Sequence, residues 1–439
     1  MSIPQQLSMF EPLQLGQELG TFKDSMRAPI HGWFKYPAGF SYRFVEMLFD
    51  EFSVQPGSWV YDPFSGTGTT LVCAKQQGIN AYGVEAHSFV HWVSQIKLYW
   101  EYNLSSLGRE VEHHLTALQG YIRSNMHLKV DGVFPELVYK CYHPTDLHTL
   151  FLIREYLNQA ESLPLIELCK LALTDTLRTS AAAGTGWPYI APNKNTGDKP
   201  PKDALKLFQS RIRGMVKDIQ IVVRSVPPGE IFSVLGDSRQ KQDLLADNQV
   251  ELALTSPPYL NNYDYADRTR LETYFWGIAN SWGEITQMFR NKLMVAATTQ
   301  IVRSEYDLEN TLNPELATIA PEVYEFLQEA VSTLSQRRLT KGGKKDYDLM
   351  VALYFNDILK VVRETYRILK PYGKFCLVLG DSAPYGVHIP TESLIGKLGL
   401  AIGFSDFEYR RFRSRGGKWK DNPQRHTVEL QEGVVILTK

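Results

Sequence analysis

With 439 residues, 44% of them hydrophobic and 22% charged, the chain has the composition of an ordinary globular protein with one large domain or two. A net charge of -1 excludes a uniformly basic nucleic-acid coat, so any contact with nucleic acid depends on local clusters of Lys and Arg. The four cysteines form no Cys-x-x-Cys pair, so we expect neither a zinc site nor a disulfide framework. No apolar run is long enough to span a membrane, and the N-terminus lacks a basic leader. We therefore expect a cytoplasmic protein without a membrane anchor.

The predicted elements begin at about residue 29, after a lead without clear periodicity. A helix is expected over Tyr42 to Phe52, directly after an aromatic segment that contains Tyr36 and Pro37. A strand over Trp59 to Tyr61 then enters a turn with two glycines, and a helix follows over 71–76. The turn, which we call the glycine loop, reads Asp62-Pro63-Phe64-Ser65-Gly66-Thr67-Gly68-Thr69-Thr70.

The glycine loop predicts a site for a nucleoside-type cofactor without a pyrophosphate. Glycines at a strand–helix junction let the backbone approach a ligand closely. A phosphate-binding loop requires Gly-Lys-Ser/Thr, but the turn has no lysine, and the dinucleotide fingerprint fails because its third glycine position is Leu71. The next strand, over residues 78–85, ends in Glu85, at the position where doubly wound folds bind a ribose diol.

Residues 91–227 are predicted to be mainly helical and to form an insertion. Within them lies a polar loop, residues 179–202, that is rich in Gly, Pro and Lys and contains Trp187 and Tyr189. Loops of this length are usually either functional or disordered, and both readings remain open. Strands are expected to resume at Ile231 to Ser238, which contains Asp237.

The apolar strand over residues 251–255 ends in the tetrapeptide Ser256-Pro257-Pro258-Tyr259. Proline fixes φ and has no N–H, so the Pro257 carbonyl is held outward instead of joining a helical turn. This carbonyl and the Ser256 hydroxyl are two acceptors for an exocyclic amino group, and Tyr259 offers an aromatic face to the ring that carries it. The tetrapeptide therefore predicts a site for a base that has been turned out of its stack, with an ordinary proline-rich turn as the alternative.

The remaining chain is predicted to hold a second helical insertion, residues 271–345, and then the last strands of a sheet. An amphipathic helix leads through a turn at 369–373 into a strand over 374–380. Two tail strands, Phe404 to Phe412 and Val428 to Thr438, are expected to pair as an antiparallel hairpin. The connection between them is basic, with Arg413, Arg415, Lys418, Trp419 and Lys420.

The glycine loop, Glu85 and Thr-Ser-Pro-Pro-Tyr together resemble the S-adenosylmethionine-dependent amino-methyltransferases of DNA, the N4-cytosine/N6-adenine family. The resemblance covers about residues 30–90 and 230–440. It implies an α/β fold of the class I methyltransferase, Rossmann-like type, with a mostly parallel seven-stranded sheet and helical insertions. The catalytic core would be residues 29–90 and 228–439, with 91–227 as a possible DNA-recognition region and 271–345 as an insertion within the core.

The resemblance also assigns roles to residues. Ser256, Pro257, Pro258 and Tyr259 would hold the target base. S-adenosylmethionine is the implied cofactor, with no metal, and the residues expected to bind it are Tyr36, Pro37, Asp62, Pro63, Phe64, Gly66, Gly68, Thr69, Glu85 and Asp237. The basic residues of the tail connection are the favoured contacts with double-stranded DNA, and a solvated loop is the alternative.

The residue at position 256 favours N4 of cytosine over N6 of adenine, because Ser is commoner in family members that methylate cytosine N4. Methylation at carbon 5 of cytosine is disfavoured, since it needs a thiolate and none of the cysteines follows a proline. The glycine loop precedes Ser-Pro-Pro-Tyr, which is the reverse of the order in many N4-cytosine enzymes. Tyr61, where an aliphatic residue is usual, and the long insertion between the second and third strands are further departures. A cognate restriction endonuclease would be a partner; an RNA or tRNA methyltransferase and a non-enzymatic binding protein are the alternatives.

Overall fold

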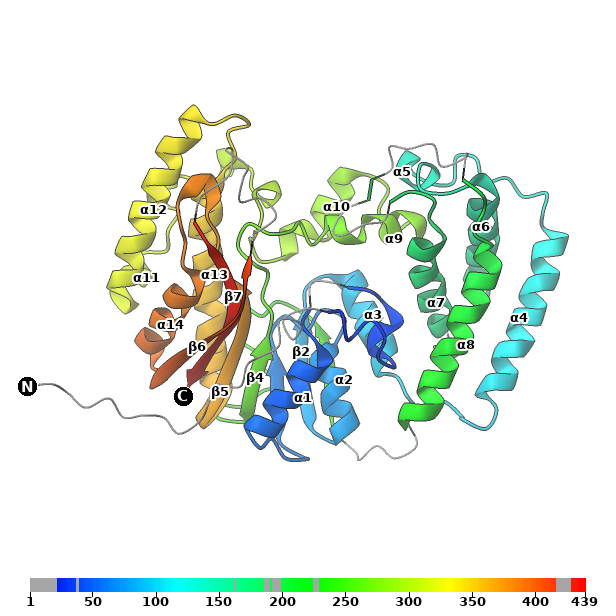
Figure 1. Ribbon diagram of the computed structural model, residues 1–439, viewed down its shortest axis with the longest axis horizontal. Coiled ribbons are helices and arrows are strands. Elements are labelled where there is room, and N and C mark those ends of the chain that lie inside the picture. Colours follow the sequence, from blue (N-terminus) through cyan, green and yellow to red (C-terminus); the bar gives the residue numbers. More distant parts are fainter. Residues whose placement is uncertain are drawn as a thin grey trace, which may run out of the picture.

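The computed structural model describes residues 22–36, 39–161, 163–184, 190–191, 199–223, 229–415 and 428–439. Its centre is a seven-stranded sheet with the order β3-β2-β1-β4-β5-β7-β6 (Figure 1). The strands β1 to β5 pair in parallel, whereas β7 pairs antiparallel with both β5 and β6. The sheet confirms the predicted α/β fold of the class I methyltransferase type. The strands are β1 (Trp59–Asp62), β2 (Asn80–Glu85), β3 (Ile231–Leu235), β4 (Val250–Thr255), β5 (Leu369–Gly380), β6 (Asp406–Arg415) and β7 (Leu430–Thr438).

Helices cover both faces of the sheet. One face carries α1 (Tyr42–Glu51), α2 (Thr69–Gln77) and α3 (Ser88–Leu98). The other carries α13 (Tyr347–Ile368) and α14 (Thr391–Ile402), with α11 (Glu315–Ile319) and α12 (Pro321–Thr340) packed outside them.

The chain between α3 and β3 forms a helical lobe, seen at one end of the molecule in Figure 1. Its helix α7 packs against α3. Two short helices from the second insertion, α9 (Arg270–Phe275) and α10 (Trp282–Met288), lie between the sheet and this lobe, and α9 contacts α5 and α7. The lobe consists of α4 (Leu107–Ser124), α5 (Glu136–Tyr139), α6 (Pro144–Gln159), α7 (Pro164–Ser180) and α8 (Ala204–Val222).

The two faces are built from alternating residues of the same strands. In β4, Leu252 and Leu254 belong to the core under α1 to α3, while Ala253 belongs to the core under α13. In β5, Cys376 lies on the first side and Phe375 on the second. Because successive side chains of a strand point to opposite faces, a continuous apolar run produces a strand buried on both sides.

Most predicted element ends lie within a few residues of the observed ones, but the predicted turn at 369–373 is wrong. These residues belong to β5 and form a bulge, since the register against β4 shifts between the pairs Val250–Leu369 and Leu252–Lys374. Within the bulge, Tyr372 has a φ of 67° and its N–H donates to the carbonyl of Lys439 (2.8 Å). A strand interrupted by a bulge contains the same Pro and Gly signals as a turn, which explains the error.

Candidate active site

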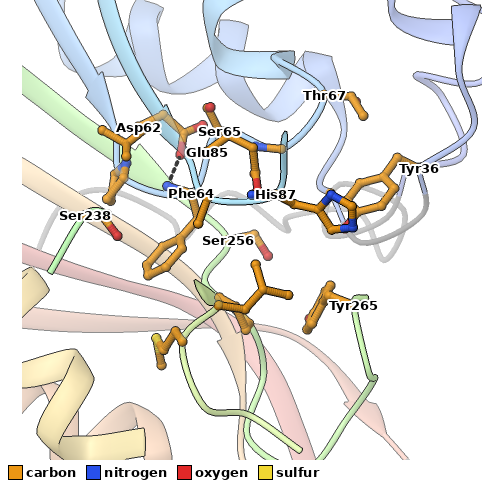
Figure 2. Close-up of a pocket in the computed structure, with 18 of the residues that line it drawn as sticks. Tyr36, Asp62, Phe64, Ser65, Thr67, Glu85, His87, Ser238, Ser256 and Tyr265 are labelled. Carbon is orange, nitrogen blue, oxygen red and sulfur yellow. Dashed lines mark hydrogen bonds between the residues drawn. The ribbon is translucent and has the colours of Figure 1, made fainter. Parts of the chain in front are cut away.

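One pocket gathers most of the predicted site residues at the carboxyl ends of β1, β2, β3 and β4 (Figure 2). It is lined by Tyr36, by the glycine loop at the end of β1, by residues 84–87 at the end of β2, by residues 236–239 after β3, and by Ser256 and Pro258 after β4. β2 and β4 flank β1 on opposite sides, so the pocket lies at a switch point of the topology, where open α/β sheets bind ligands. Its empty space, which includes part of the open solvent, is about 900 Å³.

The carboxylate of Asp62 joins the two predicted motifs. Its Oδ1 accepts hydrogen bonds from the Phe64 N–H (3.1 Å) and the Thr255 hydroxyl (2.7 Å), and its Oδ2 accepts from the Thr70 hydroxyl (2.7 Å). Thr255 is the last residue of β4 and directly precedes Ser256. Burial raises the pKa of Asp62 to about 6, although these hydrogen bonds act to lower it. Asp62 therefore fixes the glycine loop and the start of the Ser-Pro-Pro-Tyr segment relative to each other.

Glu85 faces the pocket and also holds the glycine loop. Its Oε2 accepts from the Gly66 N–H (2.9 Å) and its Oε1 accepts from the His87 N–H (2.7 Å). Burial raises the pKa of Glu85 to about 7, against the lowering effect of these amides. The predicted acid at the end of the second strand is thus placed beside the glycine loop.

The two glycines of the loop have different surroundings. Both have positive φ, 52° at Gly66 and 84° at Gly68. A Cβ on Gly68 would lie 2.7 Å from the Ser94 hydroxyl of α3, whereas a Cβ on Gly66 would meet nothing closer than the Tyr36 ring at 3.9 Å. Gly68 is therefore required by packing of the loop on α3, and only Gly66 lines the pocket.

Two buried polar atoms at the pocket have no hydrogen-bond partner among the described residues. They are the Ser65 hydroxyl and Nδ1 of His87, and their side chains are 5% and 1% exposed. The His87 ring stacks on Phe289 (4.1 Å between centroids), and Nε2 lies 2.9 Å from the Thr269 hydroxyl. Burial lowers the pKa of His87 to about 3, so the ring is neutral. Unpartnered buried polar atoms are rare in proteins, and a polar ligand in the pocket would satisfy them.

Asp237 lies at the pocket, but its carboxylate is held by Arg239. The guanidinium donates from Nε to Oδ1 (2.8 Å) and from Nη2 to Oδ2 (2.9 Å). A third nitrogen, Nη1, donates to Asp357 of α13 (3.0 Å). Arg239 also lines the pocket, so Asp237 presents its carboxylate there as part of an ion pair with this guanidinium.

The Ser-Pro-Pro-Tyr segment is only partly open to the pocket. Ser256 and Pro258 line it, whereas Pro257 is buried and Tyr259 is 9% exposed. Burial, with Glu432 nearby, raises the pKa of Tyr259 well above its usual value. The guanidinium of Arg415 lies over the Tyr259 ring, 5.3 Å from its centroid.

The predicted cofactor residues that line the pocket are Tyr36, Asp62, Pro63, Phe64, Gly66, Thr69, Glu85 and Asp237, and Pro37 lies outside the described residues. Sequence reasoning did not select Ser65 or His87. Their position in the sequence could have indicated both, since Ser65 lies inside the glycine loop and His87 follows Glu85 by two residues.

The predicted DNA contacts divide into two groups. Arg413 pairs with Glu432 through Nη2 (2.9 Å), and Arg415 reaches Glu432 (3.7 Å), Asn262 (3.4 Å) and the Asp381 carbonyl (3.4 Å). The others, Lys418, Trp419 and Lys420, lie outside the described residues, as do Trp187 and Tyr189 of the earlier loop.

All four cysteines are reduced and buried, and burial raises the pKa of each thiol. In the described part of the chain, no group of three or more His, Cys, Asp or Glu residues could hold a metal ion. None of the described helices is both long and apolar enough to cross a membrane.

Comparison with known proteins agrees with this geometry. The DNA methylase family model matches residues 17–95. The type II methyltransferase M.BsoBI of Geobacillus stearothermophilus is 25% identical over 461 residues, which cover 96% of this chain and 88% of that relative. The type II methyltransferase M.AvaI, from Nostoc sp. and from Anabaena variabilis, is 22% identical over 410 residues, covering 89% of this chain and 82% of the relative. These similarities support a DNA amino-methyltransferase.

The two kinds of similarity differ in how much of the pocket they cover. The family match contains the glycine loop and Glu85 but ends before Ser256. The alignments with the type II methyltransferases extend over most of the chain.

Proposed function

We propose that this protein is a site-specific DNA methyltransferase that transfers a methyl group from S-adenosylmethionine to the exocyclic amino group of a flipped base, with N4 of cytosine as the favoured target. The observation that carries the proposal is that the glycine loop and Glu85 line the same pocket as Ser256 and Pro258. The similarity to DNA methylases at the glycine loop supports it. Because both named relatives are type II methyltransferases, we also propose a cognate restriction endonuclease as its partner.

The residues of the pocket fit S-adenosylmethionine, which when bound supplies an activated methyl group on a sulfonium. Glu85 would accept hydrogen bonds from the ribose hydroxyls, and Phe64 would pack against the adenine. The Ser65 hydroxyl and Nδ1 of His87, which lack partners in the described structure, would hydrogen-bond to the polar groups of the cofactor. Because the Thr269 hydroxyl donates to the Ala266 carbonyl, Nε2–H of the neutral His87 ring would donate to that hydroxyl and leave Nδ1 as an acceptor.

The Ser-Pro-Pro-Tyr segment would prepare the target amine. The lone pair of an exocyclic nitrogen is delocalised into the base, so the amine is a poor nucleophile. Acceptance of its hydrogens by the Ser256 hydroxyl and the Pro257 carbonyl would favour a more tetrahedral nitrogen and direct its lone pair toward the methyl group. Tyr259 would fix the ring plane by stacking, which is worth roughly 1–3 kcal/mol per base. Since Tyr259 is 9% exposed, a base can reach its ring only when a covering side chain such as Arg415 moves.

The test is incubation of the purified protein with labelled S-adenosylmethionine and, separately, unmethylated duplex DNA and bulk RNA, followed by mass spectrometry of the nucleosides. We expect N4-methylcytosine in DNA. N6-methyladenine in DNA would keep the activity and overturn the choice of base. Label found in RNA alone, or in neither polymer, would overturn the proposal.

The Ser256→Ala variant tests the assignment of the amine site. We expect a fall in kcat of about tenfold or more, because one acceptor for the target amine is lost, with the Kd for S-adenosylmethionine within about twofold of the wild type. Full turnover by this variant would contradict the role given to Ser256.

A further inference from the structure

A segment of the second insertion, residues 289–300, contributes to the lining of the pocket; we call it the shared segment. Lys292, Leu293 and Met294 line the pocket. Met294 is 4% exposed and belongs to the core that contains α13, so its side chain is packed firmly at the edge of the pocket. None of these residues was selected from the sequence, because an insertion has no expected place in the parent fold.

One anchor of the shared segment is Arg239, at the end of β3. Its Nη2 donates to the Lys292 carbonyl (3.1 Å) and its Nη1 to Asp357 (3.0 Å). The same Asp357 oxygen accepts the N–H of Val295 (3.2 Å). Arg239 and Asp357 therefore hold the pocket-lining residues between β3 and α13, beside the carboxylate of Asp237.

The other anchor holds the loop that follows β4. Arg290, 1% exposed, donates from Nε to Oδ2 of Asp264 (2.9 Å), and the Thr299 hydroxyl donates to the same oxygen (2.9 Å). The Asn261 N–H donates to the Ala296 carbonyl (2.8 Å). Asp264 and Asn261 lie a few residues beyond Tyr259, so these contacts set the course of the chain that leaves the Ser-Pro-Pro-Tyr segment.

The shared segment is braced internally as well. Oε1 of Gln300 accepts from the N–H groups of Ala296 (2.8 Å) and Ala297 (2.9 Å), and Nε2 donates to the Met294 carbonyl (2.9 Å). Gln300 therefore ties residues 294, 296 and 297 together between the two anchors.

We propose that the shared segment completes the cofactor site through Leu293 and Met294, and that it positions the loop after Tyr259 through Arg290. Arg239 holds the shared segment in place beside the cofactor-binding residues at the end of β3. This inference rests on the proposed function. Met294 is a cofactor-contact residue, and Arg239 and Arg290 are positioning residues. The two arginines act on different partners, so their loss affects different steps.

The test compares three variants by calorimetric titration with S-adenosylmethionine and by steady-state methylation. Met294→Ala and Arg239→Gln are expected to raise the Kd for the cofactor about tenfold, with kcat at saturating cofactor within about threefold of the wild type. Arg290→Gln is expected to lower kcat more than about tenfold, with the cofactor Kd within about twofold. The Arg239→Lys variant keeps a donor near Lys292 and is expected to recover part of the affinity.

The matched control is Arg303→Gln. Arg303 lies in the same insertion and makes the same kind of ion pair, donating to Asp348 (2.8 Å) and Asp346 (2.9 Å), but it contacts neither the pocket nor the base loop. If Arg239→Gln and Arg290→Gln change Kd and kcat in the same proportion as this control, the inference is overturned. An unchanged cofactor Kd for Met294→Ala would also overturn it.

Two provisions keep the outcome interpretable. If Arg290→Gln does not fold, the Thr299→Ala variant replaces it, because this change removes one hydrogen bond to Asp264 without leaving an unpaired buried charge. Thr299→Ala should lower kcat about threefold at unchanged cofactor Kd. An unchanged kcat would contradict the positioning role. If the wild-type protein itself binds no S-adenosylmethionine, the proposed function fails. If it binds and methylates while the variants follow the control, only the inference about the shared segment fails.

Discussion

Gly57 and Gly68 share a left-handed backbone, with φ values of 83° and 84°, but differ in their surroundings. A Cβ on Gly57 would meet nothing within 4 Å, whereas one on Gly68 would lie 2.7 Å from the Ser94 hydroxyl. We expect Gly57→Ala to lower the free energy of unfolding by about 1 kcal/mol through backbone strain alone. Gly68→Ala should cost about 1–3 kcal/mol more, because the new methyl group overpacks the loop against α3.

Denaturant unfolding of both variants measures this difference. The double variant Gly68→Ala/Ser94→Ala removes the clashing hydroxyl and should recover part of the loss. Equal destabilisation by the two single variants would mean that the contact with Ser94 does not constrain the loop.

Burial of Glu85 makes the stability of the ligand-free protein depend on pH. Its pKa rises from 4.5 to about 7 on folding, so between these values the folded state binds more protons than the unfolded state. Stability must therefore fall as pH rises through this range, and Asp62, with a pKa of about 6, contributes in the same direction. We expect Glu85→Gln, which stays neutral, to flatten the fall in unfolding free energy between about pH 5 and pH 8.

Urea unfolding at several pH values checks this expectation, with the exposed Glu110→Gln as control. The control should keep the wild-type slope. If Glu85→Gln keeps it too, Glu85 is ionised in the folded state as readily as in the unfolded chain.

At the level of residues, the sequence allowed prediction of the pocket residues that lie at the ends of the strands. The glycine loop, Glu85 and Ser256 could be selected because strand ends, glycines and prolines restrict the backbone in recognisable ways. The side formed by Leu293 and Met294 could not, since ordinary apolar residues in an insertion carry no local signal. The contact of Arg415 with Tyr259 was also invisible, because it joins residues far apart in the chain.

Among the elements, α7 and α9 are joined by a buried ion pair. Arg178 donates from Nε to Oε1 of Glu272 (2.5 Å), whose side chain is fully buried, and Arg268 is a second cation nearby (3.5 Å). Burial alone would raise the pKa of Glu272, but the two arginines hold it below its usual value. We expect Arg178→Met to lower the free energy of unfolding by about 3–5 kcal/mol, because it removes one partner of a buried charge.

A double-mutant cycle with Glu272→Gln measures the coupling, which we expect to exceed about 1 kcal/mol. The exposed pair Arg213–Glu112 (2.7 Å) joins α8 to α4 and serves as the control, with a coupling below about 1 kcal/mol. Similar couplings for the two pairs would show that the buried pair does not fasten the helical lobe.

The elements themselves were largely predictable. The strands of the parallel sheet are short apolar runs bounded by turn residues, and the amphipathic periods of α8 and α13 are plain in the sequence. The bulge in β5 was not predictable, because its Lys-Pro-Tyr-Gly is also the composition of a turn. The packing of α7 of the helical lobe on α3 was not predictable from periodicity either. An apolar helix face shows that the helix is buried on that side but not which element covers it.

For the whole molecule, a net charge of -1 means that binding to DNA depends on where the cations lie. Lys418 and Lys420 carry the prediction of phosphate contacts, whereas Arg413 is already paired with Glu432. We expect Lys418→Gln/Lys420→Gln to weaken DNA binding and to reduce the slope of log K against log salt by about 2, since each lost phosphate contact accounts for about 0.9. Arg413→Gln should leave that slope unchanged, and fluorescence anisotropy over a salt series measures both. A double variant with the wild-type slope would remove this loop from the DNA interface.

The position of β4 between β1 and β5 has a consequence for synthesis on the ribosome. Asp62 and Thr255, which hydrogen-bond across β1 and β4, are 193 residues apart, and the whole helical lobe is translated between them. A nascent chain that has released β1, β2 and the lobe still exposes the unpaired edge of β1, because its neighbour β4 has not yet emerged. Domains fold as units once their chain is available, so the lobe can become compact while the pocket is still absent. A polypeptide arrested before β4 would therefore contain every helix of the lobe and the entire glycine loop, yet have no pocket.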